Sequence, residues 1–342
     1  MANSGKILVI KPSSLGDIVH LFPALELLKR EFPGKELDFV VHPAFAGILD
    51  LSPFPVRKKI LFDRKRLSAA STFFSASRSL LRELRQEEYD LVIDFQGLFR
   101  SGLLTFFARS KVKCGFAAPR EKAAVCFYNR KYDVDMTQHA VPRYVELVNR
   151  ICNTASEVPE YTVVLDKELF ADWKETFVVL VPGARWQSKM FPPEVFAQTV
   201  LEIRKHFPEC QAVIAGAAGD KSIAQQIVQL LPDAVDMTGK TTLTELAHLM
   251  ARAAAVITND SGPMHVAAAA GSRVFALFGP TSPGLTGPWG KEHRIITCEK
   301  AACLNCMKRH CPAPQKYLCH RIDCEKLGAE IGNFIKSGKE QK

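Results

Sequence analysis

The 342-residue sequence has no apolar run close to the roughly 20 residues that a membrane-spanning helix needs. Its opening residues, MANSGKILVI, also lack the pattern of a secretory signal peptide and lead directly into a strand-like segment. With 47% hydrophobic and 24% charged residues, the composition is that of a soluble globular chain. These features argue against a helical membrane protein and lead us to expect a cytoplasmic location.

Two common nucleotide-binding signatures are missing after the first expected strand, Lys6–Ile10. Residues 11–17, KPSSLGD, form neither the G-x-G-x-x-G fingerprint nor a Walker A sequence. Residues 216–222, GAAGDKS, come close to the end of a Walker A sequence, but Asp220 separates the glycine from the lysine. An NAD-dependent Rossmann oxidoreductase or epimerase is therefore only the alternative enzyme class, and a different ligand is expected.

The loop 11–17 leads into an amphipathic segment, Ile18–Glu31, which we expect to be a helix. Asp17 then lies at the helix N-terminus, where the dipole stabilises a carboxylate. We expect Asp17 to be ionised near neutral pH unless burial outweighs the dipole. Such a group can act as a general base, and the alternative is a helix cap with no chemical role.

The length exceeds the usual size of one core, so we expect two domains. Short apolar runs alternate with amphipathic segments, which is typical of parallel sheets covered by helices. This pattern begins at Lys6–Ile10 and starts again at Phe177–Val181. We expect an α/β domain over residues 1–165, a second over 176–325, and a C-terminal helix and tail over 326–342. Two such domains facing each other would leave a central cleft for a substrate.

The segment 255–285 predicts a strand, a sharp turn, a short helix and a second strand. Asp260, Ser261 and Gly262 occupy the turn, and His265 lies one helical turn further on. Free N–H groups at such a helix start favour an anion, and the imidazole would reach the same group, which suits a diphosphate. The alternative is a helix cap followed by a histidine packed on a neighbouring residue.

Positive charge is concentrated in residues 54–131, which hold 17 Lys or Arg against 7 Asp or Glu, whereas the whole chain carries +9. Within this region Arg57-Lys58-Lys59 and Arg64-Lys65-Arg66 flank the apolar Ile60-Leu61-Phe62. The mixture suits an anionic lipid surface or an acidic substrate, and a solvated basic face is the alternative. No nucleic-acid-binding motif is present, so we expect no nucleic-acid partner.

Six of the ten cysteines fall within residues 298–324. Cys303-x₂-Cys306 spacing lets two thiolates reach one ion, and a cytoplasmic protein keeps its thiols reduced. We expect a structural metal, either zinc or an iron–sulfur cluster, bound by Cys303, Cys306, Cys311 and Cys319. The spacings after Cys306 match no named signature, so free or loosely oxidised thiols remain the alternative.

Several separated motifs together resemble glycosyltransferase family 9, the bacterial heptosyltransferases. They are KPSSLGDIVHLFPAL, DFQGLFRSG, PREKAAVCFYNRKY, PGARWQSKMFP and NDSGPMHVAAAAGSRVFALFGPTSP, in this order. The similarity runs from about residue 6 to 290 and into the C-terminal helix. His20 and the segment Pro119-Arg120-Glu121 are most similar to heptosyltransferase I. Where those enzymes have a Thr-Thr pair ahead of the donor lysine, this chain has Ala184-Arg185.

The resemblance implies a GT-B fold, with two Rossmann-like α/β domains that bind acceptor and nucleotide sugar respectively. It implies an inverting, metal-independent transfer of heptose from ADP-L-glycero-β-D-manno-heptose to the Kdo–lipid A inner core. The partners would be the ADP-sugar donor, an anionic lipid A-type acceptor and the inner-membrane surface. Another nucleotide sugar or a later core acceptor is the alternative within the family, and a non-catalytic lipid- or metal-binding protein is the alternative outside it.

The resemblance also assigns residues, with Asp17 as the catalytic base. The donor-binding residues are Ser188, Lys189, Asp220, Thr241, Asp260, Ser261, Gly262 and His265. The acceptor-binding residues are Ser13, Ser14, Gly16, His20, Arg64, Gln96 and Arg120. Displacing a diphosphate from an anomeric carbon needs a base for the hydroxyl and positive or N–H groups for the departing charge, and these residue types supply both.

Overall fold

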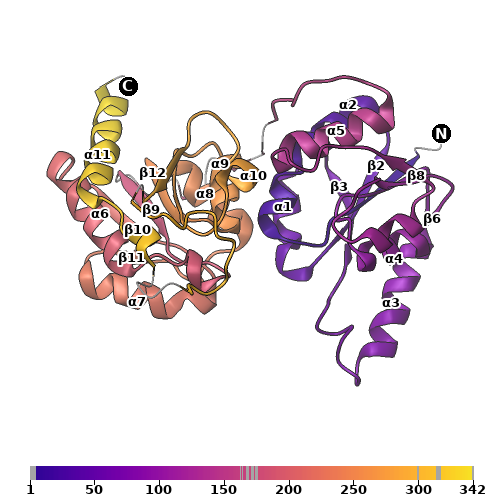
Figure 1. Ribbon diagram of the computed structural model, residues 1–342, viewed down its shortest axis with the longest axis horizontal. Helices are drawn as coiled ribbons and strands as arrows, with labels where there is room; N and C mark the ends of the chain where they lie inside the picture. Colours follow the sequence, from indigo (N-terminus) through magenta and orange to yellow (C-terminus); the bar gives the residue numbers. More distant parts are fainter. Residues whose placement is uncertain are drawn as a thin grey trace. The chain divides into compact units, whose positions relative to one another are not determined.

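In the computed structural model the chain divides into two compact units, residues 1–164 and residues 165–342 (Figure 1). The structure describes residues 5–161, 163, 165–166, 169–170, 173, 176–298, 300–312 and 317–340. The domain boundary expected near residues 160–176 lies partly outside these residues. None of the helices in the described part of the chain combines the length and the apolar character of a membrane span.

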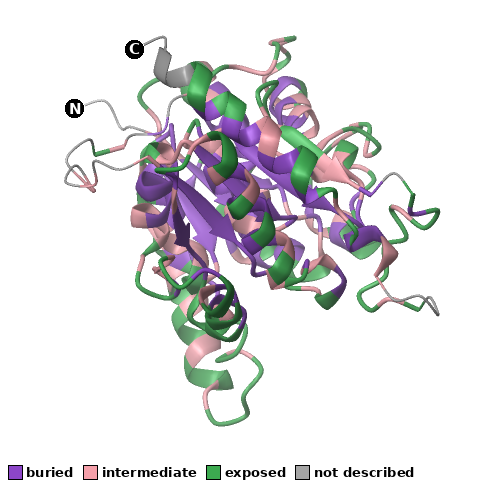
Figure 2. Ribbon diagram, turned by 90° about the vertical axis from the view of Figure 1, so that its left-hand side faces the viewer, coloured by how far each residue is buried: buried purple, intermediate pink, exposed green. Residues whose placement is uncertain are grey.

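The first unit is built on a six-stranded parallel sheet with the strand order β3-β2-β1-β5-β7-β8. Its strands are β1 (Lys6–Ile10), β2 (Glu36–Val41), β3 (Val56–Leu61), β5 (Leu91–Asp94), β7 (Lys113–Phe116) and β8 (Arg130–Tyr132). A separate short pair joins β4 (Glu88–Tyr89) to β6 (Arg109–Ser110). The central strands are apolar on both faces because helices cover both sides of a parallel sheet (Figure 2).

One helix of the first unit, expected over Ile18–Glu31, differs from the expectation. The helices of this unit are α1 (Leu15–Val19), α2 (Phe22–Glu31), α3 (Phe73–Gln86), α4 (Phe99–Phe107) and α5 (Ala140–Cys152), with 3-10 helices at Pro43–Leu51 and Lys122–Phe127. The single helix expected over Ile18–Glu31 is wrong, since the chain breaks it at His20–Leu21. Pro23 lies in the first turn of α2, where a missing N–H does no harm, but it could not continue a helix from α1.

The second unit repeats the architecture with the parallel strand order β11-β10-β9-β12-β13-β14. Its strands are β9 (Phe177–Val181), β10 (Gln211–Ile214), β11 (Val235–Asp236), β12 (Ala255–Asn259), β13 (Val274–Phe278) and β14 (Arg294–Thr297). Its helices are α6 (Pro193–His206), α7 (Lys221–Leu230), α8 (Leu243–Arg252), α9 (Gly262–Ala269), α10 (Pro283–Thr286) and α11 (Cys324–Glu340), with 3-10 turns at Gln187–Lys189, Ala218–Asp220 and Leu318–His320. The predicted strand, helix and strand of segment 255–285 are therefore confirmed.

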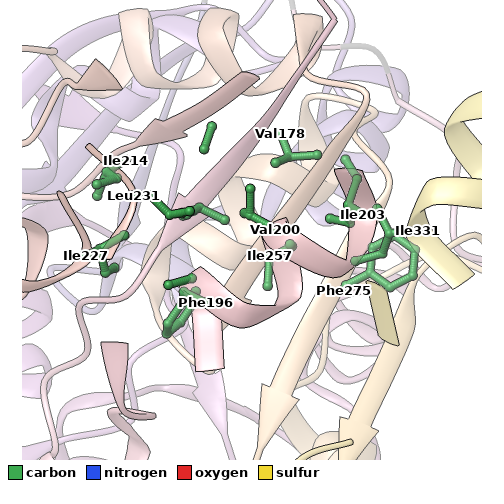
Figure 3. Close-up of a cluster of buried hydrophobic side chains, with 14 of the residues drawn as sticks. Val178, Phe196, Val200, Ile203, Ile214, Ile227, Leu231, Ile257, Phe275 and Ile331 are labelled. Atoms are coloured by element: carbon green, nitrogen blue, oxygen red, sulfur yellow. The ribbon is translucent and has the colours of Figure 1, made fainter. Parts of the chain in front are cut away.

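The core of the second unit lies between its sheet and the helices α6, α7 and α11. Figure 3 shows Val178 from β9, Ile257 from β12 and Val200 from α6 within this cluster. Ile331, from α11, packs in the same cluster. A Cβ on Gly328 would lie 2.2 Å from Glu202 Cβ, so only glycine lets α11 pack this closely on α6.

Each sheet has a switch point, where successive connections leave in opposite directions. In the first unit it lies between β1 and β5, and in the second between β9 and β12. Ligands of open α/β sheets bind at the carboxyl ends of the strands flanking such a point. We call the loops after β1 and β5 the acceptor half-site, and the loops after β9 and β12 the donor half-site.

Candidate active site

The candidate base Asp17 lies in the first turn of α1 and accepts two hydrogen bonds from Ser14. The Ser14 backbone N–H and Oγ lie 2.9 and 2.7 Å from Asp17 Oδ2. Both bonds reach one oxygen, and Asp17 Oδ1 accepts no hydrogen bond from the residues that the structure describes. Asp17 is thus a cap of its own helix that still has an oxygen available to an incoming hydroxyl.

Lys11 provides the positive charge that acts on Asp17. It is only 3% exposed, its Nζ donates to the Phe95 carbonyl at 3.1 Å, and it lies 4.9 Å from the ring centroid of Tyr144. Burial alone would raise the pKa of Asp17, but the Lys11 charge and the hydrogen bonds from Ser14 outweigh it and lower that pKa. This direction agrees with the expectation that Asp17 is ionised near neutral pH. We did not predict a role for Lys11, because a lysine directly after a strand is usually exposed.

The two loops of the acceptor half-site are joined by a hydrogen bond. The Ser13 N–H donates to Gln96 Oε1 at 3.2 Å. Gln96 is held in turn by Asp94 Oδ1, which accepts the Gln96 N–H at 2.8 Å, while the hydroxyls of Ser101 and Tyr128 both lie 2.7 Å from Asp94 Oδ2. Burial raises the pKa of Asp94 against the effect of these hydrogen bonds. Asp94 is thus a buried support, and Ser13 and Gln96 are the groups it helps to place at the surface of the half-site.

The remaining acceptor residues lie at different distances from Asp17. Gly16 precedes it in α1, and His20 is buried at the end of α1 with its ring 4.9 Å from that of His139. Arg120 follows β7 and is exposed, and its backbone nitrogen lies 3.5 Å from the position that a Cβ on Gly97 would take, beside Gln96. Arg64 is exposed on the segment before α3, which Figure 1 shows well away from α1. The structure therefore places Gly16 and His20 in or at the end of the helix that carries Asp17, and Arg120 beside the loop after β5, whereas Arg64 lies on a separate segment.

The donor half-site is centred on an ion pair between Lys189 and Asp260. Lys189 Nζ lies 2.6 Å from Asp260 Oδ2, and the Thr281 hydroxyl donates to the same oxygen. The Lys189 ammonium also lies 4.9 Å from the ring centroid of Trp186. The Asp260 side chain is only 6% exposed and that of Lys189 18%, so the lysine is the accessible partner. Sequence analysis named both residues but did not predict that they pair, and it missed Thr281.

Asn259 connects the two loops of the donor half-site. Its Nδ2 donates to the Pro182 carbonyl at 2.6 Å, and its Oδ1 accepts the Phe191 N–H at 3.4 Å. These bonds cross the switch point from the end of β12 to both ends of the loop after β9. Asn259 was missed as a site residue because its position next to a helix start suggests only a turn. Its buried amide fixes the loop that presents Lys189.

The start of α9 has the form expected of an anion site. Ser261 is the N-cap with extended backbone, and Gly262 is the first helical residue. The Ser261 Oγ is buried and makes no hydrogen bond within the described ranges. His265 is also buried, one helical turn further along. The four residues Asp260, Ser261, Gly262 and His265 thus lie together at the carboxyl end of β12, where the helix dipole favours a negative group.

Asp220 lies over two glycines at the neighbouring strand ends. A Cβ on Gly183 would lie 2.3 Å from Asp220 Cγ, and one on Gly216 would lie 2.8 Å from Asp220 Oδ2. The carboxylate accepts the Ala217 N–H at 2.9 Å. Thr241 is half-buried and directly precedes the N-cap of α8. Asp220 is therefore placed at the carboxyl ends of β9 and β10, where a nucleotide ribose would lie in this type of unit.

Ser188 is anchored by the cysteine-rich segment instead of pointing toward a ligand. Its Oγ donates to the Lys308 carbonyl at 2.6 Å, and its N–H donates to the Arg309 carbonyl at 3.2 Å. Its carbonyl accepts from His320 Nε2 at 2.8 Å. Ser188 is only 3% exposed. These contacts hold the turn before Lys189 in place.

The four expected metal ligands differ in exposure. Cys303 and Cys306 are exposed, Cys311 is half-buried and Cys319 is buried. As they stand, no three His, Cys, Asp or Glu side chains of the described ranges are gathered closely enough to hold a metal ion. All ten cysteines are free thiols in this structure.

Comparison with known proteins identifies the family. Residues 77–317, more than two thirds of the chain, match glycosyltransferase family 9 (heptosyltransferase). Lipopolysaccharide heptosyltransferase 1 of Pseudomonas aeruginosa is 30% identical over 312 residues, which are 90% of this chain and 87% of that protein. This chain belongs to glycosyltransferase family 9. The family assignment makes the protein a glycosyltransferase, as the sequence motifs indicated.

Solved structures of family 9 enzymes share the fold. Escherichia coli heptosyltransferase WaaC with ADP aligns with a TM-score of 0.76 and 25% identity over 98% of this chain and 99% of that one. Escherichia coli ADP-heptose heptosyltransferase II aligns with a TM-score of 0.81 and 22% identity over the same shares of the two chains. The expected pair of Rossmann-like α/β domains of a family 9 enzyme is confirmed.

Proposed function

We propose that this family 9 enzyme transfers a heptose from ADP-L-glycero-β-D-manno-heptose to the Kdo–lipid A inner core of lipopolysaccharide. The observation that supports an ADP-sugar as the donor is the Lys189–Asp260 ion pair beside the start of α9. A lysine and free helical N–H groups at one strand edge suit a sugar diphosphate. Relatives named lipopolysaccharide heptosyltransferase 1, at 30% and 28% identity, support the choice of sugar and acceptor.

The proposed reaction is a single displacement. Asp17 Oδ1 takes the proton of the acceptor hydroxyl as its oxygen bonds to the anomeric carbon, and the bond from that carbon to the ADP oxygen breaks. Attack from the side opposite the leaving group inverts the configuration. The negative charge that develops on ADP is met by Lys189 and by the Gly262 end of α9. These groups supply the charge that the step requires, so we propose a transfer that is independent of metal.

We also propose that the first unit associates peripherally with the anionic inner-membrane surface. Arg64, Lys65 and Arg66 are exposed, and in the part of the chain that the structure describes their side chains form no ion pair. Phe73 and Phe74, at the start of α3, are 46% and 83% exposed. Basic groups next to exposed aromatic rings match a lipid surface, where the charges attract head groups and the rings enter the boundary.

The first basic cluster, Arg57-Lys58-Lys59, is not part of this surface. Arg57 pairs with the buried Asp38 and Lys59 with Asp50, in both cases with 2.5 Å between nitrogen and oxygen. Lys58 donates to Gln86 at 2.8 Å. These side chains stabilise the edge of the sheet. The membrane surface proposed here is therefore limited to residues 64–66 and the first turn of α3.

The decisive test is a transfer assay with defined substrates. Purified protein would be incubated with ADP-L-glycero-β-D-manno-heptose and a Kdo–lipid A acceptor, with ADP release and product mass followed over time. We expect a heptosylated product whose anomeric configuration, measured by NMR, is inverted relative to the donor. A matched reaction with an acceptor that already carries one heptose would reveal a later core step. Turnover with a UDP-sugar alone, or retained configuration, would contradict the proposal.

A further inference from the structure

The segment that carries Cys303 and Cys306 lies along the backbone at the end of β13. The Asn305 N–H donates to the Gly279 carbonyl at 3.0 Å, and the Met307 N–H donates to the Pro280 carbonyl at 2.7 Å. Asn305 and Met307 have positive φ values of 60° and 56°, which are uncommon for residues other than glycine. Cys306 is therefore held on a tight turn between two backbone anchors.

Cys319 reaches the same backbone from the other direction along the chain. Its Sγ lies 3.0 Å from the position that a Cβ on Gly279 would occupy. Cys319 also packs with Ala301 and Leu304, which lie on either side of Cys303 in the sequence. Cys303, Cys306 and Cys319 are thus brought to one stretch of backbone, the end of β13.

Cys311 already has one feature of a thiolate ligand. The Tyr317 N–H donates to its Sγ at 3.4 Å. Hydrogen bonds to sulfur are part of the surroundings of thiolate-bound metal centres. Cys311 and Cys319 are therefore both held in place by backbone contacts, and Cys303 and Cys306 form the exposed side of the group.

The other candidate ligands of this segment are occupied. The Cys324 thiol donates to the Val195 and Ile322 carbonyls at 3.8 and 3.7 Å, and Cys298 packs in an apolar cluster. His320 donates to Ser188, and its ring stacks on Phe191 with 4.3 Å between centroids. His310 Nδ1 lies 3.3 Å from Gln187 Oε1. These contacts leave Cys303, Cys306, Cys311 and Cys319 as the set with the chemistry of a four-thiolate centre.

We propose that Cys303, Cys306, Cys311 and Cys319 bind one metal centre of thiolate-preferring type, a Zn²⁺ ion or iron, which fixes the loop of the donor half-site. Binding releases the four thiol protons to solvent and forms four metal–sulfur bonds. The backbone anchors at Asn305 and Met307 stay in place, and the exposed side chains of Cys303 and Cys306 turn toward Cys319 to complete the centre. The centre is structural, and no step of the transfer passes through it.

The link to the donor half-site is the chain between Cys306 and Cys311. The Lys308 and Arg309 carbonyls accept hydrogen bonds from the Oγ and the N–H of Ser188, the residue before Lys189. The Arg309 guanidinium also lies 5.4 Å from the ring centroid of Trp186, the ring that Lys189 faces. A metal that fixes residues 306–311 therefore fixes Lys189. This second part rests on the proposed donor role of Lys189.

Elemental analysis of untagged protein, purified anaerobically and reconstituted with zinc and with iron, tests the metal site. We expect about one zinc, or iron as a single ion or cluster, per chain, with absorbance spectra distinguishing the forms of iron. Cys306→Ser and Cys311→Ser should lose the metal, whereas Cys324→Ser, in the same segment, should keep it. Less than about 0.2 metal ions per chain in the reconstituted parent, or equal metal in Cys306→Ser and the parent, would overturn the site.

Titration calorimetry with ADP tests the positioning role separately. Chelation of the metal, or Cys306→Ser, should weaken ADP binding at least tenfold, and adding metal back should restore the parent protein but not the variant. Unchanged ADP affinity in the chelated protein would overturn the positioning role. If no form of the protein bound ADP, the proposed donor would be wrong, while metal content and its loss in Cys306→Ser would still decide the site.

Discussion

The Lys189 ammonium lies 2.6 Å from the Asp260 carboxylate, which also accepts a hydrogen bond from Thr281. Asp260 is the buried partner, so this pair keeps a lysine extended at the strand edge where a diphosphate would arrive. A diphosphate presents more negative charge than one carboxylate and can therefore share or take over the lysine. The ion pair therefore positions Lys189 for a diphosphate, and it can break when the diphosphate binds.

Lys189→Ala is expected to weaken binding of ADP and of the donor and to lower stability. A hydrogen bond to a charged group contributes about 1.5–3 kcal/mol, so affinity for ADP should fall roughly 10- to 150-fold. Stability should fall because Asp260 is left buried without its partner. The double variant Lys189→Ala/Asp260→Ala should recover thermal stability but not ADP affinity in calorimetry. ADP affinity equal to that of the parent in Lys189→Ala would remove the lysine from the donor site.

Asp17→Asn should abolish transfer while leaving fold and ADP affinity close to those of the parent. The amide oxygen can still accept from Ser14, so the cap of α1 survives, but the base is lost. Loss of a general base typically lowers the rate ~10²–10⁴-fold. Steady-state turnover and ADP titration on the same sample separate the two effects. Turnover within about threefold of the parent would rule out Asp17 as the base.

The pH profile of the reaction should depend on Lys11. In the folded protein the pKa of Asp17 lies below its ordinary value, so the base stays ionised as pH falls through the ordinary aspartate range and is lost only below it. Lys11→Gln removes the main opposing charge, and the pKa of Asp17 should rise. The acidic limb of kcat/KM should then move to higher pH. An acidic limb at the same pH in both proteins would show that Lys11 does not act on the base.

The stability associated with Asp17 follows the same shift. A carboxyl group whose pKa is lowered on folding stabilises the protein above its unfolded pKa, and this contribution is lost as pH falls through the folded pKa. Parent and Asp17→Asn should therefore differ in melting temperature at neutral pH and converge in acid. A difference that is constant over the whole pH range would point to packing instead of charge.

Replacement of Arg64, Lys65 and Arg66 by Gln should reduce binding to vesicles that contain anionic lipid. Each charge near such a surface contributes about 1 kcal/mol, so the three together should change binding about 100-fold at low salt. The double variant Phe73→Ser/Phe74→Ser should weaken vesicle binding at high salt as well, because salt does not screen the hydrophobic burial of the two rings. The matched control replaces the exposed Lys111, Arg130 and Lys131 of the same unit. Equal loss in the control would indicate unspecific charge attraction.

Much of this arrangement was predictable, because buried parallel strands are apolar and loops at their carboxyl ends carry ligands. Segment 255–285 followed from these rules, and so did a helix N-terminus near Asp17, although α1 begins at Leu15 and not at Ile18. The pairing of Lys189 with Asp260 did not, since it depends on β9 and β12 being neighbours in the sheet although about 70 residues separate them in the chain. The burial of Lys11 was unpredictable for a similar reason, as Phe95 and Tyr144 come from distant elements.

One error was avoidable. Pro23 in the sequence already signals a helix start, and the break between α1 and α2 follows from it. The break matters for the site because it makes α1 a single short turn, whose geometry is set by Ser14 and Asp17 more than by helical propagation. If α1 and α2 formed one long helix, more consecutive helical hydrogen bonds would fix the backbone at Asp17.

Gly328→Ala should destabilise the second unit by about 1–3 kcal/mol through overpacking. The new Cβ would lie 2.2 Å from Glu202 Cβ and 3.0 Å from the Thr199 carbonyl oxygen, neither of which can move without the backbone of α6. Gly284→Ala, where the nearest atom is 3.7 Å away, is the matched control. Melting curves of the two variants should differ clearly, and equal curves would show that α11 can shift without loss.

The packing of α11 on α6 also affects how the second unit folds during translation. Leu327, Ile331 and Ile335 complete a core whose other members begin at Val178, so the second unit stays open along α6 until the last of these residues leaves the ribosome. The first unit contains its own sheet and can fold while the second is being synthesised. Nascent chains that stall before Ile335 would therefore expose the apolar face of α6, which is the kind of surface that chaperones bind.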